Sequence, residues 1–230
     1  MDELRFVKEP SIRVWLARYR DLLVAHAPEA GLTSLRDPAE IERRHIGESL
    51  ALMEALEAKG LLVSPVIDIG AGGGLPGIPL KIARPELEMT LLEATRKKVA
   101  FLELAVRDLQ LHNVNVVGAR AEDAARDPAH RERYRLALAR AVAPLPVLIE
   151  LALPFLQVGG ALASPKGSRA SEEVAAAENA LSECGGEVEG VYEIELPWPG
   201  TAPSLVIVRK TSQTPERYPR RAGIPAKRPL

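Results

Sequence analysis

The spacing of hydrophobic and polar positions changes once along this 230-residue chain. Over residues 2–60, apolar side chains recur at intervals of three and four, which predicts amphipathic helices rather than strands. A second helix is expected to begin at Pro38, with Asp37 as its N-cap, and to end near Gly60. We therefore expect residues 1–60 to form a helical cap. The inward face of its first helix is predicted to carry Ile12, Trp15, Leu16, Tyr19, Leu22 and Leu23.

From residue 61 onward, short apolar runs alternate with helical segments, which predicts a parallel sheet with crossover helices. An alanine-rich helix is expected over residues 171–184. The last two apolar runs are joined by too few residues for a crossover helix, so they should form an antiparallel hairpin. We expect a mostly parallel, Rossmann-like seven-stranded sheet within residues 61–210. The expected strands are residues 66–69, 87–92, 114–117, 136–139, 160–164, 191–196 and 205–209.

Residues 66–79, V-I-D-I-G-A-G-G-G-L-P-G-I-P, predict a strand, a glycine-rich loop and the start of a helix. Glycines allow a ligand to approach the backbone closely. Asp68, near the end of the strand, would repel a dinucleotide pyrophosphate but suits a cationic nucleoside such as S-adenosylmethionine. The next apolar run ends in Glu93, where an acid can hold ribose hydroxyls. This pattern is typical of class I methyltransferases; the alternative is that Asp68 caps the turn and Glu93 starts the following helix.

Charge adds one local feature to this picture. The formal net charge is −1, so no overall field indicates a nucleic-acid partner. Residues 211–230, in contrast, are basic and rich in proline, which predicts a tail that buries little and offers cations to phosphates. Cys184 is the only cysteine, which excludes an internal disulfide. No apolar run is long enough to span a membrane, so we expect a cytoplasmic protein without a membrane partner.

Several motifs, in the same order over nearly the whole length, resemble the RsmG (GidB) family of bacterial ribosomal RNA methyltransferases. The resemblance implies transfer of a methyl group from S-adenosylmethionine to N7 of a guanine in small-subunit (16S) ribosomal RNA, near the decoding region. It implies ribosomal RNA or the small ribosomal subunit as the partner, and we expect a monomer. The motifs are R-R-H-I-G-E-S-L at 43–50, D-I-G-A-G-G-G-L-P-G-I-P at 68–79, L-L-E-A-T-R-K-K-V-A-F-L at 91–102, A-R-A-V-A-P-L at 139–145, G-G-A-L-A-S-P-K-G at 159–167 and R-R-A-G-I-P-A-K-R-P-L at 220–230.

The loop and the resemblance together imply a set of site residues. Guanine N7 has a lone pair and no proton, so positioning rather than a general base should dominate catalysis. Asp68, Glu48 and Arg140 are the catalytic candidates, the two acids because the methylated guanine is cationic. No metal site is expected. Cofactor contacts are expected at Asp68, Gly70, Gly72, Gly74, Leu75, Glu93, Ala94, Ala121, Glu122 and Arg140. RNA contacts are expected at Arg140, Lys166, Arg220, Arg221, Lys227 and Arg228.

Two positions depart from the family pattern, and alternatives to this function remain open. Glu48 stands where the family commonly has Asp, and Arg135 stands where an Asp usually precedes the fourth strand. The alternative functions are methylation of a small metabolite and a non-catalytic nucleotide-sensing or RNA-binding module. An NAD-dependent oxidoreductase is disfavoured by Asp68 and by the terminal hairpin.

Overall fold

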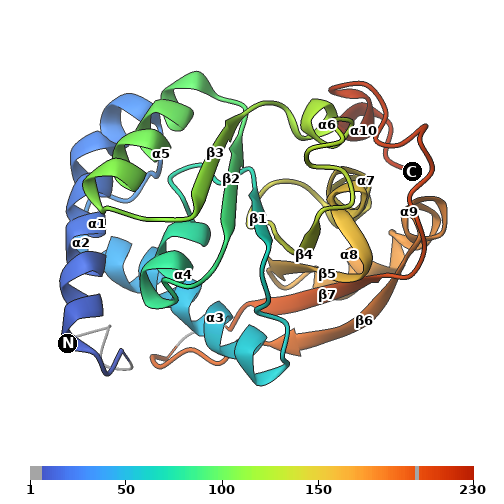
Figure 1. Ribbon diagram of the computed structural model, residues 1–230. Coiled ribbons are helices and arrows are strands. Elements are labelled where there is room, and N and C mark those ends of the chain that lie inside the picture. Colours follow the sequence, from blue (N-terminus) through green and yellow to red (C-terminus); the bar gives the residue numbers. More distant parts are fainter. Residues whose placement is uncertain (1–6, 200–201) are drawn as a thin grey trace.

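One seven-stranded sheet runs through the centre of the computed structural model, which describes residues 7–199 and 202–230 (Figure 1). The strand order is β3-β2-β1-β4-β5-β7-β6. Strands β1 to β5 are parallel, whereas β7 is antiparallel to both of its neighbours. The predicted α/β fold with a terminal antiparallel hairpin is therefore confirmed. The strands are β1 (Val66–Ile69), β2 (Met89–Glu93), β3 (Val114–Gly118), β4 (Tyr134–Leu138), β5 (Leu156–Lys166), β6 (Gly186–Glu193) and β7 (Ser204–Lys210).

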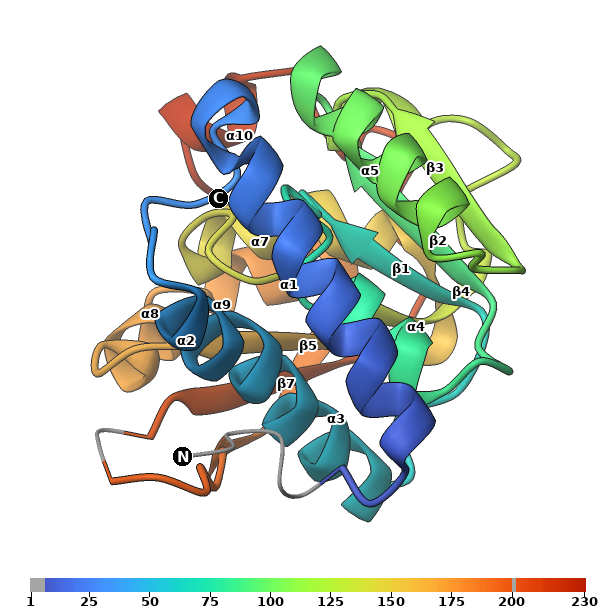
Figure 2. The same cartoon turned by 90° about the vertical axis from the view of Figure 1, so that its left-hand side faces the viewer.

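Helices cover both faces of the sheet, so the molecule has three layers (Figure 1). In Figure 2 the longest helix, α1, crosses in front of the sheet beside α4 and α5. The first face carries α1 (Pro10–Ala30), α2 (Pro38–Ile41), the π-helix η1 (Glu42–Gly47), α3 (Glu48–Ala58), α4 (Gly77–Ala83) and α5 (Arg96–Asp108). The second face carries α6 (Ala121–Ala124), α7 (Leu145–Ala152), the short 3₁₀ turn η2 (Leu153–Phe155), α8 (Ala170–Ala175), α9 (Glu178–Cys184) and α10 (Ile224–Lys227).

The buried strands divide the apolar residues into two cores, because successive side chains point to opposite faces of a sheet. In β1, Val66 belongs to the core under the N-terminal helices, and Ile67 and Ile69 belong to the core under α7 and α9. Asp68 shares the face of Val66. This alternation places Asp68 beneath the helices of the first face, where its side chain is fully buried.

The N-terminal helices follow the predicted capping signals. Helix α1 ends at Gly31, whose φ of 64° is left-handed, and the side chain of Asp37 accepts a hydrogen bond from the backbone N–H of Ala39. The second predicted helix is divided by the π-helix η1. A π-turn widens the backbone and shifts the faces of the helix that follows it. This turn directly precedes Glu48.

Several predicted elements differ from the structure in their bounds; β2 begins at Met89 rather than at 87, and β5 covers Leu156–Lys166 rather than 160–164. The alanine-rich segment forms two short helices, α8 and α9, and Ala177 between them is buried in the second core. Strand β6 begins at Gly186 rather than near 191, since an edge strand with one exposed face lacks a continuous apolar run. Strand β4 begins at Tyr134, so Arg135 lies within the strand, exposed, rather than before it.

The predicted basic tail is mostly exposed, but it is anchored to the rest of the protein at four buried residues, Thr214, Tyr218, Pro219 and Pro225. Residues 211–230 pack beside α6, α7 and α9, as the red segment in Figure 1 shows. The Arg131 guanidinium donates hydrogen bonds to the carbonyl oxygens of Thr214, at 2.7 Å, and Tyr218, at 3.0 Å. The Tyr218 side chain is buried in the second core. Basic composition predicted solvation, and most of the segment's cations are indeed exposed; Arg220 is the exception, because it pairs with the buried Glu150. None of the described helices is both long and apolar enough to cross a membrane.

Candidate functional site: two adjoining cavities

A cavity of about 450 Å³ opens where β1 and β2 end, the edge at which open α/β sheets bind ligands. It is referred to below as the β1–β2 cavity. The ends of β1, β2 and β3 form its floor, and the C-terminal segment forms part of its wall. Its lining comprises Ile69, Gly70, Leu92, Glu93, Ala94, Thr95, Ala119, Arg120, Ala121, Glu122, Val142, Ala143, Val147, Leu151, Ala222, Gly223 and Ala226.

Two glutamates in this cavity are held by backbone N–H groups. Glu93, at the end of β2, accepts hydrogen bonds from Gly72 N–H at 3.0 Å and from Thr95 N–H at 2.7 Å. Each carboxylate oxygen has a further lone pair, so the fixed group can still accept hydrogen bonds from ligand hydroxyls. Glu122 accepts a hydrogen bond from Gly223 N–H at 2.8 Å. The second acid therefore ties the C-terminal segment to the cavity wall.

Asp68 is buried beneath the glycine-rich loop with half of its carboxylate unpaired. Its Oδ2 accepts a hydrogen bond from Gly77 N–H at 2.9 Å, whereas Oδ1 has no partner among the described residues. Burial raises the pKa of Asp68 to about 7, against the opposing effects of the Gly77 N–H and the Arg140 cation. An unpaired, buried carboxylate oxygen is costly and calls for a donor, best a cationic one.

The loop over Asp68 depends on glycine at two positions in particular. Gly70 has a φ of 67°, and a Cβ there would lie 2.9 Å from a methyl of Val142. Gly74 has a φ of 88°, and a Cβ would overlap the side chain of Ile78. Both positions need a left-handed backbone and close packing, which glycine alone supplies without strain. The predicted glycine-rich turn is thus shaped by its neighbours as well as open to a ligand.

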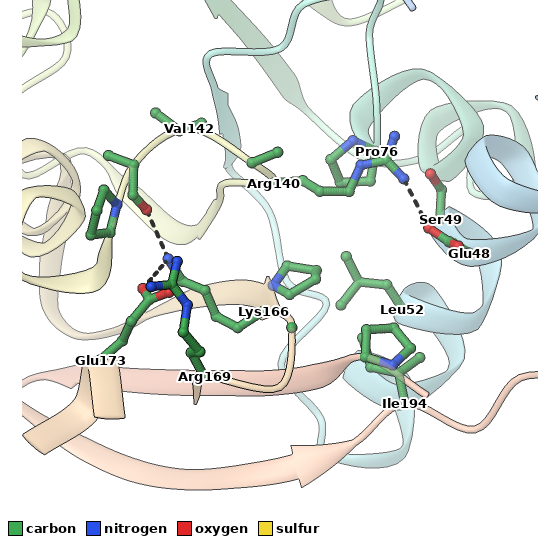
Figure 3. Close-up of a pocket in the computed structure, with 16 residues that line it drawn as sticks. Glu48, Ser49, Leu52, Pro76, Arg140, Val142, Lys166, Arg169, Glu173 and Ile194 are labelled. Atoms are coloured by element: carbon green, nitrogen blue, oxygen red, sulfur yellow. Dashed lines mark hydrogen bonds and ion pairs between the residues drawn. The ribbon is translucent and has the colours of Figure 1, made fainter. Parts of the chain in front are cut away.

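A second cavity, of about 490 Å³, lies between α3 and β5 and is referred to as the α3–β5 cavity (Figure 3). Two ion pairs stand on opposite sides of it: Arg140 with Glu48 at 3.6 Å, and Lys166 with Glu173 at 2.9 Å. Val142 and Ala143 line both cavities, so the two adjoin at the loop that follows β4. Apolar side chains fill the wall between the ion pairs: Leu52, Pro76, Val142, Pro165 and Ile194.

Arg140, the second residue after β4, is fixed by a neutral histidine. Burial, and next the charge of Arg140, lower the pKa of His45 to about 4. The guanidinium can only donate, so His45 Nδ1 accepts its hydrogen bond at 3.4 Å. The Nε2–H of the neutral ring then donates to Thr33 Oγ1 at 2.7 Å. His45 is therefore a half-buried anchor for Arg140 rather than a surface group.

The loop after β4 is anchored at several points. Ala141 has a φ of 57°, an uncommon conformation for a residue with a Cβ and one that clusters at functional sites. The carbonyl oxygen of Ala143 accepts a hydrogen bond from Lys166 Nζ at 2.8 Å, and the N–H of Leu145 donates to Glu173 at 2.8 Å. Ser164 Oγ donates to the carbonyl oxygen of Ala139 at 3.0 Å. This loop, where the cavities meet, is held from β5 and α8.

The cations predicted to contact RNA fall into two groups. Arg140, Lys166 and Arg220 are engaged in ion pairs, and the partner of Arg220 is Glu150, which is 0% exposed. The other group is exposed on the C-terminal segment: Arg221, Lys227 and Arg228. Within residues 7–199 and 202–230, which the structure describes, no group of three or more His, Cys, Asp or Glu side chains could hold a metal ion.

Five of the predicted cofactor residues line the β1–β2 cavity: Gly70, Glu93, Ala94, Ala121 and Glu122. The structure does not place Asp68, Gly72, Gly74 or Leu75 in the lining of either cavity, and Arg140 lies with Glu48 in the adjoining one. The sequence interpretation missed Gly223, Ala226 and Glu173. The first two belong to the motif at 220–230, whose resemblance could have indicated a site role that its basic composition concealed. For Glu173 no sequence signal was present, because it lies in a charged, alanine-rich helix.

Comparison with known proteins gives one consistent result. The family model described as rRNA small subunit methyltransferase G matches residues 14–197. The chain is 46% identical over 214 residues to the ribosomal RNA small subunit methyltransferase G of Roseiflexus castenholzii, covering 93% of this chain and 90% of that protein. It is 44% identical over 212 residues to the protein of the same name from Desulfitobacterium hafniense, covering 92% and 87%. Among solved structures, a SAM-dependent methyltransferase from Aquifex aeolicus matches with a TM-score of 0.57 and 20% identity, covering 79% of this chain and 97% of that one.

Proposed function

The chain belongs to the rRNA small subunit methyltransferase G family, and we propose that it methylates N7 of one guanine in small-subunit ribosomal RNA, near the decoding region, with S-adenosylmethionine as the donor. The family interpretation made from the motifs is confirmed, and so is that of an rRNA methyltransferase. The observation that carries the finer proposal is the pairing of two cavities. One is lined by acids suited to a cationic nucleoside, and it adjoins a second cavity at the loop after β4.

The residues of the β1–β2 cavity fit the donor. Glu93 lines this cavity, and its remaining lone pairs suit the ribose hydroxyls of the donor. Asp68 does not line the cavity but lies buried beneath the adjoining loop, where its unpaired Oδ1 suits the ammonium group of the donor. Gly70, Gly72, Gly74 and Leu75 would border its methionine part, and Ala94, Ala121 and Glu122 its adenosine part. When bound, the donor supplies an electrophilic methyl carbon on a positively charged sulfur.

The chain's own residues then have to orient the base. Guanine N7 carries an in-plane lone pair and no proton, so no side chain has to act as a general base. Positioning and exclusion of water become the main catalytic contributions. The α3–β5 cavity can supply both, since its apolar wall shelters the base. Arg140 and Glu48 place one charge of each sign beside it. Glu48 is placed to offset the positive charge that methylation leaves on guanine.

We propose that the exposed cations of the C-terminal segment bind RNA phosphates. Arg221, Lys227 and Arg228 belong to the same segment as the residues that line the β1–β2 cavity. Replacing all three with glutamine should reduce the slope of log affinity against log salt concentration by about 2 to 3, because each phosphate contact contributes about 0.7–0.9. Arg135→Gln, an exposed cation near the opposite ends of the strands, is the matched control. An unchanged slope in the triple variant would contradict this interface.

The decisive test is transfer of labelled methyl to small subunits and to naked ribosomal RNA that lack the modification, with 7-methylguanosine mapped by base-specific cleavage. Label at a single guanine N7 is expected, and the better substrate of the two is the natural form. Turnover without RNA would favour a metabolite methyltransferase. Donor binding without transfer to any RNA would favour a sensing module. Because ribosomal RNA is the proposed substrate, we propose that the protein works in the cytoplasm. We also propose that it is a monomer.

A further inference from the structure

Glu48 is the one carboxylate in the α3–β5 cavity that lacks a hydrogen bond among the described residues. Its nearest charged partner is Arg140, at 3.6 Å, beyond hydrogen-bonding distance. Glu173, on the other side of the same cavity, is satisfied by Lys166 and by the Leu145 N–H. The Glu48 side chain is 31% exposed. The cavity therefore presents a carboxylate with both oxygens available to whatever enters it (Figure 3).

Guanine carries donors that match this group. Its N1–H and one N2–H point in the same direction in the plane of the base, and a carboxylate offers two acceptors in one plane. Adenine presents an acceptor at N1 and has no 2-amino group, so the same carboxylate would repel it. Recognition of an unstacked base through its Watson–Crick edge is the common mode for RNA. A carboxylate that accepts both N1–H and N2–H would therefore select guanine over adenine.

The position of Glu48 also suits the reaction. On guanine, N7 lies on the side of the base opposite to N1 and N2. Glu48 stands on one side of the α3–β5 cavity, whereas Val142 and Ala143 form the wall shared with the β1–β2 cavity. A base whose N1 and N2 face Glu48 turns N7 away from the acid. The faces of the base would lie against apolar side chains such as Leu52 and Ile194.

Three cations lie close enough to Glu48 to favour its ionised form against the effect of burial. Burial raises the pKa of Glu48, and the positive charges of Arg140, Arg44 and Arg43 oppose that effect. Arg140 itself is oriented by the neutral ring of His45. Its guanidinium lies beside the acid, so it is placed to donate to O6, the acceptor next to N1 on the same edge. With Arg140 as the donor and Glu48 as the acceptor, the two side chains would recognise guanine O6 and N1–H together.

We propose that Glu48 is the specificity-determining residue of this enzyme, accepting N1–H and N2–H of the target guanine and directing N7 toward the methyl donor. The inference rests on the proposed guanine-N7 activity and adds the residue that selects the base.

The test compares guanosine with inosine, which lacks only the 2-amino group, at the target position of a reconstituted small-subunit RNA. The wild-type protein should methylate guanosine with a kcat/KM roughly 10- to 100-fold above that for inosine, the value of one hydrogen bond to a charged group. In Glu48→Gln the carboxamide NH₂ would face the guanine amine. That variant should lose activity on guanosine, and its preference should collapse to a ratio near one. Glu48→Asp keeps both acceptors and should retain a clear preference.

Two controls separate the possible outcomes. Glu173→Gln changes the other carboxylate of the cavity and should lower both rates together, leaving the ratio unchanged. Donor binding measured by calorimetry should be the same in Glu48→Gln as in the wild type, which shows that the variant is folded. Equal losses on guanosine and inosine in Glu48→Gln would overturn the proposal, because Glu48 would then act only by positioning Arg140. Wild-type protein that leaves guanosine N7 unmethylated would instead refute the proposed function itself.

Discussion

Replacing Asp68 with asparagine should stabilise the protein in the absence of its methyl donor and weaken binding of the donor. The carboxyl is fully buried, one of its oxygens is unpaired, and its pKa is raised to about 7 from an ordinary 3.8. Keeping it ionised in the fold at pH 8 therefore costs roughly 4 kcal/mol. Asparagine can still accept the Gly77 N–H with its carbonyl oxygen. Its NH₂ group would be left unpaired at a cost of about 1–3 kcal/mol, so the net gain is about 1–3 kcal/mol.

The pH dependence of this gain follows from the direction of the pKa shift. The folded-state pKa of Asp68 lies above the unfolded-state value, so its contribution to stability is fully present below pH 3.8 and is lost as the pH rises through 7. The advantage of Asp68→Asn should accordingly be present at pH 8 and shrink toward zero near pH 5. Urea unfolding of both proteins at the two pH values measures it. A variant that is less stable than wild type at pH 8 would show that Asp68 is not a strained, unpaired acid.

The affinity for the methyl donor should change in the opposite direction, because Asp68→Asn should bind the donor more weakly than the wild type although it is the more stable protein. Only ionised Asp68 can pair with a cationic group, and a pKa of about 7 makes the ionised fraction, and with it the affinity, rise about tenfold from pH 6 to pH 8. Asp68→Asn should bind roughly 10- to 100-fold more weakly at pH 8. The ratio of the two affinities cancels the titration of the donor's own amino group. His45, with a pKa of about 4, does not titrate in this range.

Isothermal titration calorimetry with S-adenosylmethionine at pH 6, 7 and 8 is the assay. Glu93→Gln is the matched control, because Glu93 lines the same cavity and is held by backbone N–H groups. This control should bind the donor more weakly while keeping a rise of affinity with pH, and that rise should move to lower pH because the charge of Glu93 helps to raise the pKa of Asp68. A ratio of wild-type to Asp68→Asn affinity that stays constant from pH 6 to 8 would refute the assignment of Asp68 to the donor's cation.

Three further substitutions test the supporting structure. Arg220→Ala leaves the buried Glu150 without its cationic partner and should lower the free energy of unfolding by about 2–3 kcal/mol. Arg221→Ala, at the exposed and adjacent position, should leave the free energy of unfolding unchanged. Equal urea midpoints for the two variants would contradict the anchoring role of Arg220. Gly77→Ala would bring a Cβ within 2.6 Å of Leu91 and 2.8 Å of the Asp68 carboxylate. Thermal unfolding should therefore show a loss of about 1–3 kcal/mol in the free energy of unfolding, and an unchanged melting temperature would argue against this packing. Lys166→Met frees the loop after β4 and should lower turnover by about 100-fold with donor affinity unchanged by calorimetry; loss of donor binding instead would place Lys166 in the donor site.

The sheet was predictable because its central strands are buried on both faces and read as apolar runs between glycine and proline signals. Strand β1 was placed at its observed limits for this reason. The helix break at Ala177 and the π-turn at residues 42–47 were not predictable, since both arise from packing that local propensity does not encode.

The C-terminal segment shows most clearly where composition misleads. Arginines and prolines near a chain end predict a solvated, phosphate-binding tail, and four of its five cations remain exposed: Arg217, Arg221, Lys227 and Arg228. Arg220 is different because its partner, Glu150, lies 70 positions earlier in the chain. Glu150 is a lone acid within the apolar run at 147–156, which is itself a signal, because an ionised side chain in a core needs a partner. The sequence therefore shows both Glu150 and Arg220, but it does not show that the fold brings them together.

The predicted and the missed site residues differ in what they do. The motifs indicated groups that face a ligand through a carboxylate or a glycine backbone, and Gly70, Glu93 and Glu122 among them line the β1–β2 cavity, as do the missed Gly223 and Ala226. Other missed contacts, those of Glu173, Ser164 and Lys166, instead hold the loop after β4 from β5 and α8. Since both cavities meet at that loop, a small displacement there would spoil the alignment of base and donor while leaving each bound. Substitutions at these anchors should therefore reduce turnover rather than affinity, and this separates them from Asp68 and Glu93 in any kinetic comparison.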